Sequence, residues 1–159
     1  MTENMIRVAV NGYGVIGKRV VDAVRAMPDM VLVGVADVIG DWRIRTAVGQ
    51  GIAVFAATGQ GEAAMRDAGV PVAGSLEDLL GAIDVVVDTT PKKVAATNLA
   101  TYRAAGVKAV FQGGEAHATT GHSFVAQANY ASAVGRDMTR VVSCNTTSVV
   151  RVLGALQDA

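Results

Sequence analysis

The sequence of 159 residues is poor in the side chains that most often build reactive and cross-linked sites. It contains one cysteine, Cys144, and two histidines, His117 and His122. A single cysteine excludes an intramolecular disulfide, and it is either a buried apolar residue or a reactive thiol. We expect no metal site.

Aromatic residues, net charge and long apolar runs are also scarce. Aromatic residues make up 4% of the chain and the formal net charge at pH 7 is zero, so nothing attracts nucleic acid or an anionic membrane as a whole. No apolar run approaches the ~20 residues that span a bilayer, and residues 1–5 do not read as a signal peptide. We therefore expect a cytoplasmic protein that binds neither nucleic acid nor membrane.

The chain is rich in hydrophobic residues, which make up 51% against 18% charged, so disorder is excluded. Short apolar runs alternate with patterns of helical spacing, which predicts one α/β domain with a doubly wound, mostly parallel sheet over residues 1–159. The expected strands are 6–10, 30–36, 53–57, 84–88, 108–111 and 140–143, and the expected helices are 15–26, 61–68, one through Leu76, Leu79 and Leu80, 94–105 and 146–158.

A glycine-rich turn joins the first strand to the first helix. Residues 12–17 fit the pattern G-x-G-x-x-G, which is informative when a strand precedes it and a helix and second strand follow. Gly12 permits the tight turn, Gly14 lets a pyrophosphate approach the backbone, and Gly17 allows close packing of helix and strand. This turn, with the strands and helix around it, predicts that residues 1–159 form a Rossmann-like dinucleotide-binding domain. Residues 88–91, at the end of a later strand, should line its dinucleotide crevice. The alternative for the glycine turn is a turn that binds no ligand, and the alternative for residues 88–91 is an ordinary strand exit.

An acidic residue ends the second strand and bears on the choice of cofactor. Asp37 follows Gly17 by about 20 positions, where a carboxylate holds the adenosine ribose. Its charge would repel a 2′-phosphate, which favours NAD. Arg43 and Arg45 lie just downstream and could neutralise such a phosphate, so NADP stays possible. The alternative for Asp37 is a solvated loop carboxylate.

Cys144 lies where the strand predicted last along the chain passes into a helix. The helix dipole and free N–H groups stabilise a thiolate there and could hold an oxyanion. The polar residues 145–147 favour a nucleophile over a buried structural cysteine. Such a thiol beside a nicotinamide suggests aldehyde oxidation through a thioester, which needs a base. His117 and His122 are interpreted as exposed loop residues.

With these residues in hand, the chain resembles archaeal-type phosphorylating glyceraldehyde-3-phosphate dehydrogenase over nearly its whole length. The resemblance rests on residues 11–19, 105–115, 123–130 and 140–147. It implies oxidation and phosphorylation of glyceraldehyde 3-phosphate to 1,3-bisphosphoglycerate with NAD(P)⁺, in a homotetramer.

The resemblance also implies roles for individual residues. Cys144 would form the thioacyl enzyme, and Ser143 and Asn145 would contact the aldehyde. Val15 and Ile16 would give backbone contacts to the dinucleotide, and Gly114 would line the nicotinamide side; these five join Gly12, Gly14, Gly17 and Asp37 as candidate site residues.

Two features depart from the family. Such proteins often carry Thr-Lys or Ser-Lys where this chain has Ala36-Asp37, which again favours NAD. They are also about twice as long, so we expect the substrate domain and the histidine base to be absent from this chain. An exposed interface should then make the chain self-associate. The rival readings are a non-catalytic NAD-binding module and part of a related semialdehyde dehydrogenase.

Overall fold

A single parallel sheet runs through the molecule. The computed structural model describes residues 5–157 and residue 159. Eight strands are arranged in the order β4-β3-β2-β1-β5-β6-β8-β7, and all neighbouring pairs are parallel, which confirms the predicted fold class. The strands are β1 (Ile6–Asn11), β2 (Met30–Asp37), β3 (Val54–Ala56), β4 (Gly74–Ser75), β5 (Val85–Asp88), β6 (Lys108–Phe111), β7 (Ser123–Phe124) and β8 (Met138–Val141).

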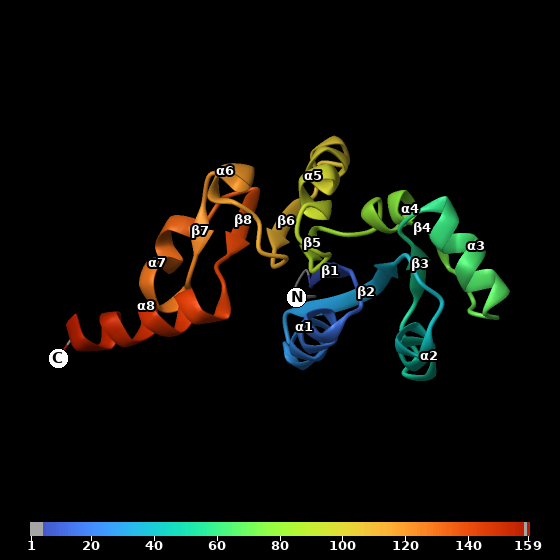
Figure 1. Cartoon of the computed structure of the whole chain (residues 1–159), viewed down its shortest axis with the longest axis horizontal. Helices are drawn as coiled ribbons and strands as arrows, with labels where there is room; N and C mark the ends of the chain where they lie inside the picture. The colour runs from blue at the N-terminus through green and yellow to red at the C-terminus, as the bar shows by residue number, and fades with distance from the viewer. Residues whose placement is uncertain (1–4, 158) are drawn as a thin grey trace.

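Helices connect the strands and cover both faces of the sheet, with α1 and α2 on one side and α5 on the other (Figure 1). The strand order runs outward from β1 in both directions, so the chain reverses between β1 and β5, where ligands of such sheets bind. The helices are α1 (Val15–Ala26), α2 (Trp42–Gly49), α3 (Gly59–Asp67), α4 (Leu76–Leu80), α5 (Val94–Ala104), α6 (His117–Thr120), α7 (Ala126–Ala133) and α8 (Cys144–Gln157).

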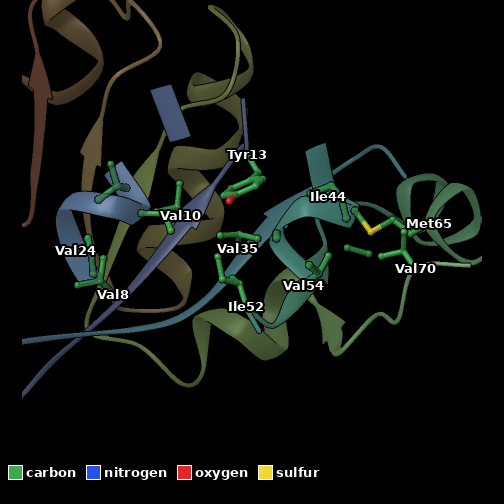
Figure 2. Packing of buried hydrophobic residues seen from close by; sticks show 14 residues of the cluster. Val8, Val10, Tyr13, Val24, Val35, Ile44, Ile52, Val54, Met65 and Val70 are labelled. Carbon is green, nitrogen blue, oxygen red and sulfur yellow. The ribbon is translucent and has the colours of Figure 1, made fainter. Parts of the chain in front are cut away.

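The core has two parts, one on each face of the sheet. Alternate residues of a strand point to opposite faces, and accordingly Val8 and Val10 of β1 belong to one cluster and Ala9 to the other. Figure 2 shows the first cluster, in which residues of β1, β2 and β3 pack with Ile44 of α2 and Met65 of α3. The second cluster joins β5 and β6 to α4 and α5.

Helix α2 was missing from the sequence prediction. Its N-cap is Asp41, whose side chain accepts a hydrogen bond from the Arg43 N–H at 2.9 Å. Only Ile44 and Ala47 are buried in this helix. Two apolar positions over eight residues are too weak a pattern to distinguish a helix from a loop.

Several expected boundaries were wrong. β8 spans Met138–Val141, not 140–143, and α8 begins at Cys144 instead of residue 146. The helix starts early because the Ser143 hydroxyl accepts from the Thr146 N–H and the Ser143 carbonyl accepts from the Thr147 N–H. α3 likewise begins at Gly59, two residues before the expected start. The expected end of α8, residue 158, lies outside the described residues.

A capping box begins α4. The Ser75 hydroxyl accepts from the Asp78 N–H at 3.2 Å, and the Asp78 carboxylate accepts from the Ser75 N–H at 2.8 Å. Across residues 5–157 and 159, no helix has the combined length and apolar character required to span a membrane. Residues 1–4, part of the segment judged not to be a signal peptide, lie outside the described residues.

Candidate dinucleotide-binding site

A cavity of about 410 Å³ opens at the carboxyl edge of the sheet, where the chain reverses between β1 and β5. Four connections contribute to it: the β1–α1 turn, the segment from the end of β2 into α2, the β3–α3 turn and the β5–α5 turn. The lining residues are Asn11, Gly12, Gly14, Asp37, Val38, Ile39, Arg43, Ala57, Thr58, Thr89, Thr90, Pro91, Val94 and Asn98.

The glycines of the β1–α1 turn meet three different steric conditions. Gly12 has φ +95°, and a Cβ there would lie 3.1 Å from backbone atoms of Thr89 and Thr90. A Cβ at Gly17 would overlap the Gly12 carbonyl oxygen, because α1 packs directly against the turn. Gly14, which lines the cavity, has nothing within 4 Å of its Cβ position. The turn therefore needs Gly12 and Gly17 for its shape, whereas the space at Gly14 is open to a ligand.

The start of α1 has the character of an anion site. Its N-cap, Gly14, has no side chain to bond the first N–H groups, and its first turn carries no acidic residue. Free N–H groups and the positive end of the helix dipole favour a phosphate. The side chains of Val15 and Ile16 are 71% and 46% exposed and do not line the cavity, so contacts from these residues would be made by their backbone. These features fit a dinucleotide pyrophosphate.

Two charged side chains line the cavity, one at the end of β2 and one in α2. The Asp37 carboxylate accepts hydrogen bonds of 2.7 Å from the N–H groups of Tyr13 and Val38, which hold it in place. Arg43 donates through two nitrogens to Asp41, at 2.9 and 2.7 Å. This hydrogen bonding raises the pKa of Arg43 and lowers that of Asp41. Arg45 is exposed, outside the lining, and donates to the Ala68 carbonyl.

The β5–α5 turn is held by a buried carboxylate. Asp88 is fully buried and accepts from the Thr90 N–H, the Thr90 hydroxyl, the Asn98 amide and the Tyr102 hydroxyl at 2.6–2.9 Å. Burial, reinforced by the charge of Asp88, raises the pKa of Tyr102. The prediction that residues 88–91 line the crevice holds for Thr89, Thr90 and Pro91. The sequence reading missed Asn11 and Asn98, although Asn11 directly precedes the glycine motif.

Cys144 lies apart from this cavity. It is exposed at the first position of α8, with its Sγ 3.9 Å from the Asn145 Oδ1. β8 is two strands away from β5, which corresponds to about 10 Å across the sheet. In Figure 1, α8 extends from the outer end of the sheet. The structure thus groups Gly12, Gly14 and Asp37, and leaves outside the cavity lining the residues Ser143, Cys144, Asn145 and Gly114.

Each histidine departs from its prediction as an exposed loop residue, His122 in its burial and His117 in its secondary structure. His122 was expected in an exposed loop but is 6% exposed, with its ring nitrogens 2.6 Å from the Thr139 hydroxyl and 2.9 Å from the Ser132 hydroxyl. Burial lowers its pKa. His117 is exposed, as expected, but begins the short helix α6. In the described part of the chain, neither imidazole is hydrogen-bonded to Cys144, and no cluster of three His, Cys, Asp or Glu side chains could hold a metal.

Comparisons with known proteins agree with this geometry. The family described as Dihydrodipicolinate reductase, N-terminus, matches residues 6–146. Glyceraldehyde-3-phosphate dehydrogenase from Methanothermobacter thermautotrophicus is 48% identical over 97% of this chain, and that from Thermococcus onnurineus is 50% identical over 96%. The chain covers 46% of each of these relatives, and thus spans about half their length.

Solved structures show the same fold. Aspartate semialdehyde dehydrogenase II from Vibrio cholerae matches 98% of this chain and 47% of its own, with a TM-score of 0.64 at 15% identity. An NAD-binding protein from Listeria innocua matches 69% of this chain and 27% of its own, with a TM-score of 0.51 at 18% identity. From the family match and the archaeal relatives, the chain belongs to the family described as Dihydrodipicolinate reductase, N-terminus, and is a homologue of the amino-terminal, nicotinamide-dinucleotide-binding half of archaeal glyceraldehyde-3-phosphate dehydrogenase.

Proposed function

We propose that this chain binds NAD in the cavity at the carboxyl edge of the sheet, as the cofactor-binding half of a phosphorylating glyceraldehyde-3-phosphate dehydrogenase. One observation carries the proposal: the open space at Gly14, at the start of α1, faces the same cavity as the Asp37 carboxylate. A pyrophosphate at the helix start and a ribose at the carboxylate correspond to the adenosine-diphosphate part of a dinucleotide. The backbone at Val15 and Ile16 would hold the pyrophosphate.

The charges at the end of β2 support NAD over NADP. The Asp37 carboxylate can accept from ribose hydroxyls and would repel a 2′-phosphate. Arg43 is the cation that could bind such a phosphate, but its guanidinium is already engaged by Asp41. Binding of NADP requires Arg43 to leave Asp41, so we expect it to be weaker.

Cys144 would carry the covalent chemistry. Its thiolate would add to the aldehyde carbonyl to give a hemithioacetal. Loss of a hydride from the hemithioacetal carbon and of a proton from its hydroxyl would leave a thioester. Phosphate would then attack the thioester carbonyl, which releases the Cys144 thiolate and the product acyl phosphate. A bound nicotinamide would supply the hydride acceptor. Ser143 and Asn145 flank the thiol and would contact the aldehyde, and Gly114 would lie on the nicotinamide side. The proton-accepting histidine would come from the substrate domain that the longer relatives contain.

The domain boundaries, location and assembly belong to the same proposal. Residues 1–159 would form one dinucleotide-binding domain, in a cytoplasmic enzyme that assembles as a homotetramer. A non-catalytic NAD-binding module is the second candidate, and it is favoured by the distance of Cys144 from the cavity lining and by the engagement of both His122 nitrogens.

The first test is calorimetric titration of the chain with NAD⁺ and NADP⁺. We expect both to bind, NAD⁺ more tightly; absence of binding to either would overturn the proposal. The second test mixes the chain with the carboxyl-terminal half of the Methanothermobacter relative and follows NADH formation from glyceraldehyde 3-phosphate and phosphate. Activity that is lost in Cys144→Ser supports the dehydrogenase, whereas NAD⁺ binding without turnover supports the module.

A further inference from the structure

Asn11 carries a buried oxygen that no described group satisfies. It is the last residue of β1, is 2% exposed and lines the cavity. Its Nδ2 donates to the Tyr102 hydroxyl at 2.7 Å, whereas its Oδ1 is buried and has no hydrogen-bond partner within residues 5–157. Buried polar atoms almost always have a hydrogen-bond partner, so we expect this oxygen to accept a hydrogen bond from a group outside the chain.

The direction of the Asn11 amide is determined by its neighbours. The Asp88 carboxylate receives four donors, one of which is the only hydrogen of the Tyr102 hydroxyl. The Tyr102 oxygen can then only accept, and it accepts from the Asn11 amide nitrogen. A flipped amide would set two acceptors against each other. The network therefore keeps the amide nitrogen on Tyr102 and leaves the carbonyl oxygen on the side away from it.

The groups of a dinucleotide indicate which of them could donate to the Asn11 oxygen. Its pyrophosphate has only acceptor oxygens, whereas its riboses carry hydroxyl donors. Asp37 lies at the end of β2, on one side of β1, and is proposed to take the adenosine ribose. The Asn11 side chain reaches the other way, towards Tyr102 of α5 and the end of β5. With the adenosine ribose at Asp37, a bound dinucleotide would place its second ribose, the one that bears the nicotinamide, on this side of the cavity.

We propose that Asn11 is a binding residue whose Oδ1 accepts a hydrogen bond from a hydroxyl of the nicotinamide-side ribose, and that Tyr102 is the positioning residue that orients it. The inference rests on the proposed function, because it assumes that a dinucleotide occupies the cavity. It adds a contact that distinguishes a dinucleotide from a mononucleotide such as ADP.

The test compares ligands that differ in the second ribose. Calorimetry would measure ADP, ADP-ribose and an ADP-ribose analogue whose terminal ribose lacks its 2- and 3-hydroxyls. A hydrogen bond of ordinary strength corresponds to roughly a 3- to 10-fold change in affinity. We expect the wild-type chain to lose about that factor on removal of the hydroxyls. In Asn11→Ala the same removal should cost nothing further, and ADP affinity should stay within about twofold.

Tyr102→Phe should show the same selective loss for ADP-ribose, because the amide of Asn11 is then free to turn. A merely structural variant would change ADP and ADP-ribose affinity together. Val70→Ala is the matched control, since Val70 is buried in the core but does not line the cavity; its ratio of ADP-ribose to ADP affinity should match wild type.

The outcomes separate this inference from the proposed function. Failure of wild type to bind NAD⁺ overturns both. Binding of NAD⁺ with equal affinity for ADP-ribose and its dideoxy analogue overturns the role of Asn11 alone, and this measurement needs no variant to fold. An Asn11→Ala chain that still loses affinity when the hydroxyls are removed also overturns it.

Discussion

At the scale of single residues, Asp37 is the side chain on which cofactor choice depends. Its carboxylate is held by the N–H groups of Tyr13 and Val38 and lines the cavity. We predict that Asp37→Ala weakens NAD⁺ binding by about 10- to 100-fold, because a hydrogen bond to a charged group contributes about 1.5–3 kcal/mol. NADP⁺ binding should fall less. Calorimetric titration measures both, and Asp67→Ala, an exposed position on α3, is the control. Equal losses for the two cofactors would contradict the assignment.

Glu115 presents a second unsatisfied group. Both of its carboxylate oxygens are buried and without a hydrogen-bond partner among the described residues. One of them and the Thr90 carbonyl oxygen crowd the same side of Gly113. Glu115→Gln would remove the buried carboxylate and provide an amide donor for the Thr90 carbonyl. We predict that the free energy of unfolding rises by about 1–2 kcal/mol.

Urea unfolding would measure this change. Glu62→Gln is the control, because Glu62 forms an exposed ion pair with Arg66 and its loss should cost at most about 1 kcal/mol. A lower unfolding midpoint for Glu115→Gln would mean that the carboxylate is required as such.

At the scale of elements, the β1–α1 turn separates stability from binding. Gly14→Ala places a methyl group in open space, whereas Gly17→Ala places one on the Gly12 carbonyl oxygen. We predict that Gly14→Ala keeps the wild-type melting temperature and loses at least about tenfold in NAD⁺ affinity, because the methyl group occupies the pyrophosphate position. Gly17→Ala should lose more than about 2 kcal/mol of stability. If Gly14→Ala binds NAD⁺ like wild type, the pyrophosphate lies elsewhere.

The starts of α2 and α4 depend on ionised aspartates. Hydrogen bonds from Arg43 lower the pKa of Asp41, and hydrogen bonds from Ser75 lower that of Asp78. Because their pKa values are lower in the folded state, both contribute stability above the unfolded value of about 4 and lose it as pH falls towards the folded value. We predict that the urea midpoint decreases between pH 5 and pH 2.5.

Asp41→Asn should reduce the slope of this decrease, because asparagine still caps the helix but does not titrate. The exposed Asp67→Asn serves as the comparison and should retain the wild-type slope. A midpoint that is constant over this pH range would show that the two carboxylates are not coupled to folding.

At the scale of the whole molecule, α8 leaves an apolar surface uncovered. None of its described residues is buried, and Val149, Val152, Leu153 and Leu156 form an apolar stripe at helical spacing with 58–68% exposure. An exposed stripe of this kind favours association. We predict that the chain self-associates with rising concentration and that Leu153→Glu with Leu156→Glu reduces this. Light scattering would test it, and a monodisperse wild-type monomer at high concentration would contradict it.

The local pattern of the sequence was sufficient for most of the sheet and for the glycine turn. β1, β2 and β5 are nearly continuous apolar runs, interrupted by Arg7 and ending in polar residues, and buried parallel strands are typically built from such runs. The turn at Gly12 and the capping box at Ser75 each involve residues within six positions of one another, so a short stretch of sequence is enough to predict them. The start of a helix close to Cys144 was predicted for the same reason.

Only the tertiary structure decided the contacts between distant segments. The burial of His122 depends on hydroxyls 10 and 17 positions away, and the Asn11 amide is oriented by Tyr102, 91 positions along the chain. α2 is a helix because Ile44 and Ala47 enter a core built by other elements. The separation of Cys144 from the cavity follows from the strand order, which places β6 between β5 and β8. Hydrophobic periodicity and capping act over a few residues, whereas strand order and side-chain partners are settled by the packing of the whole chain.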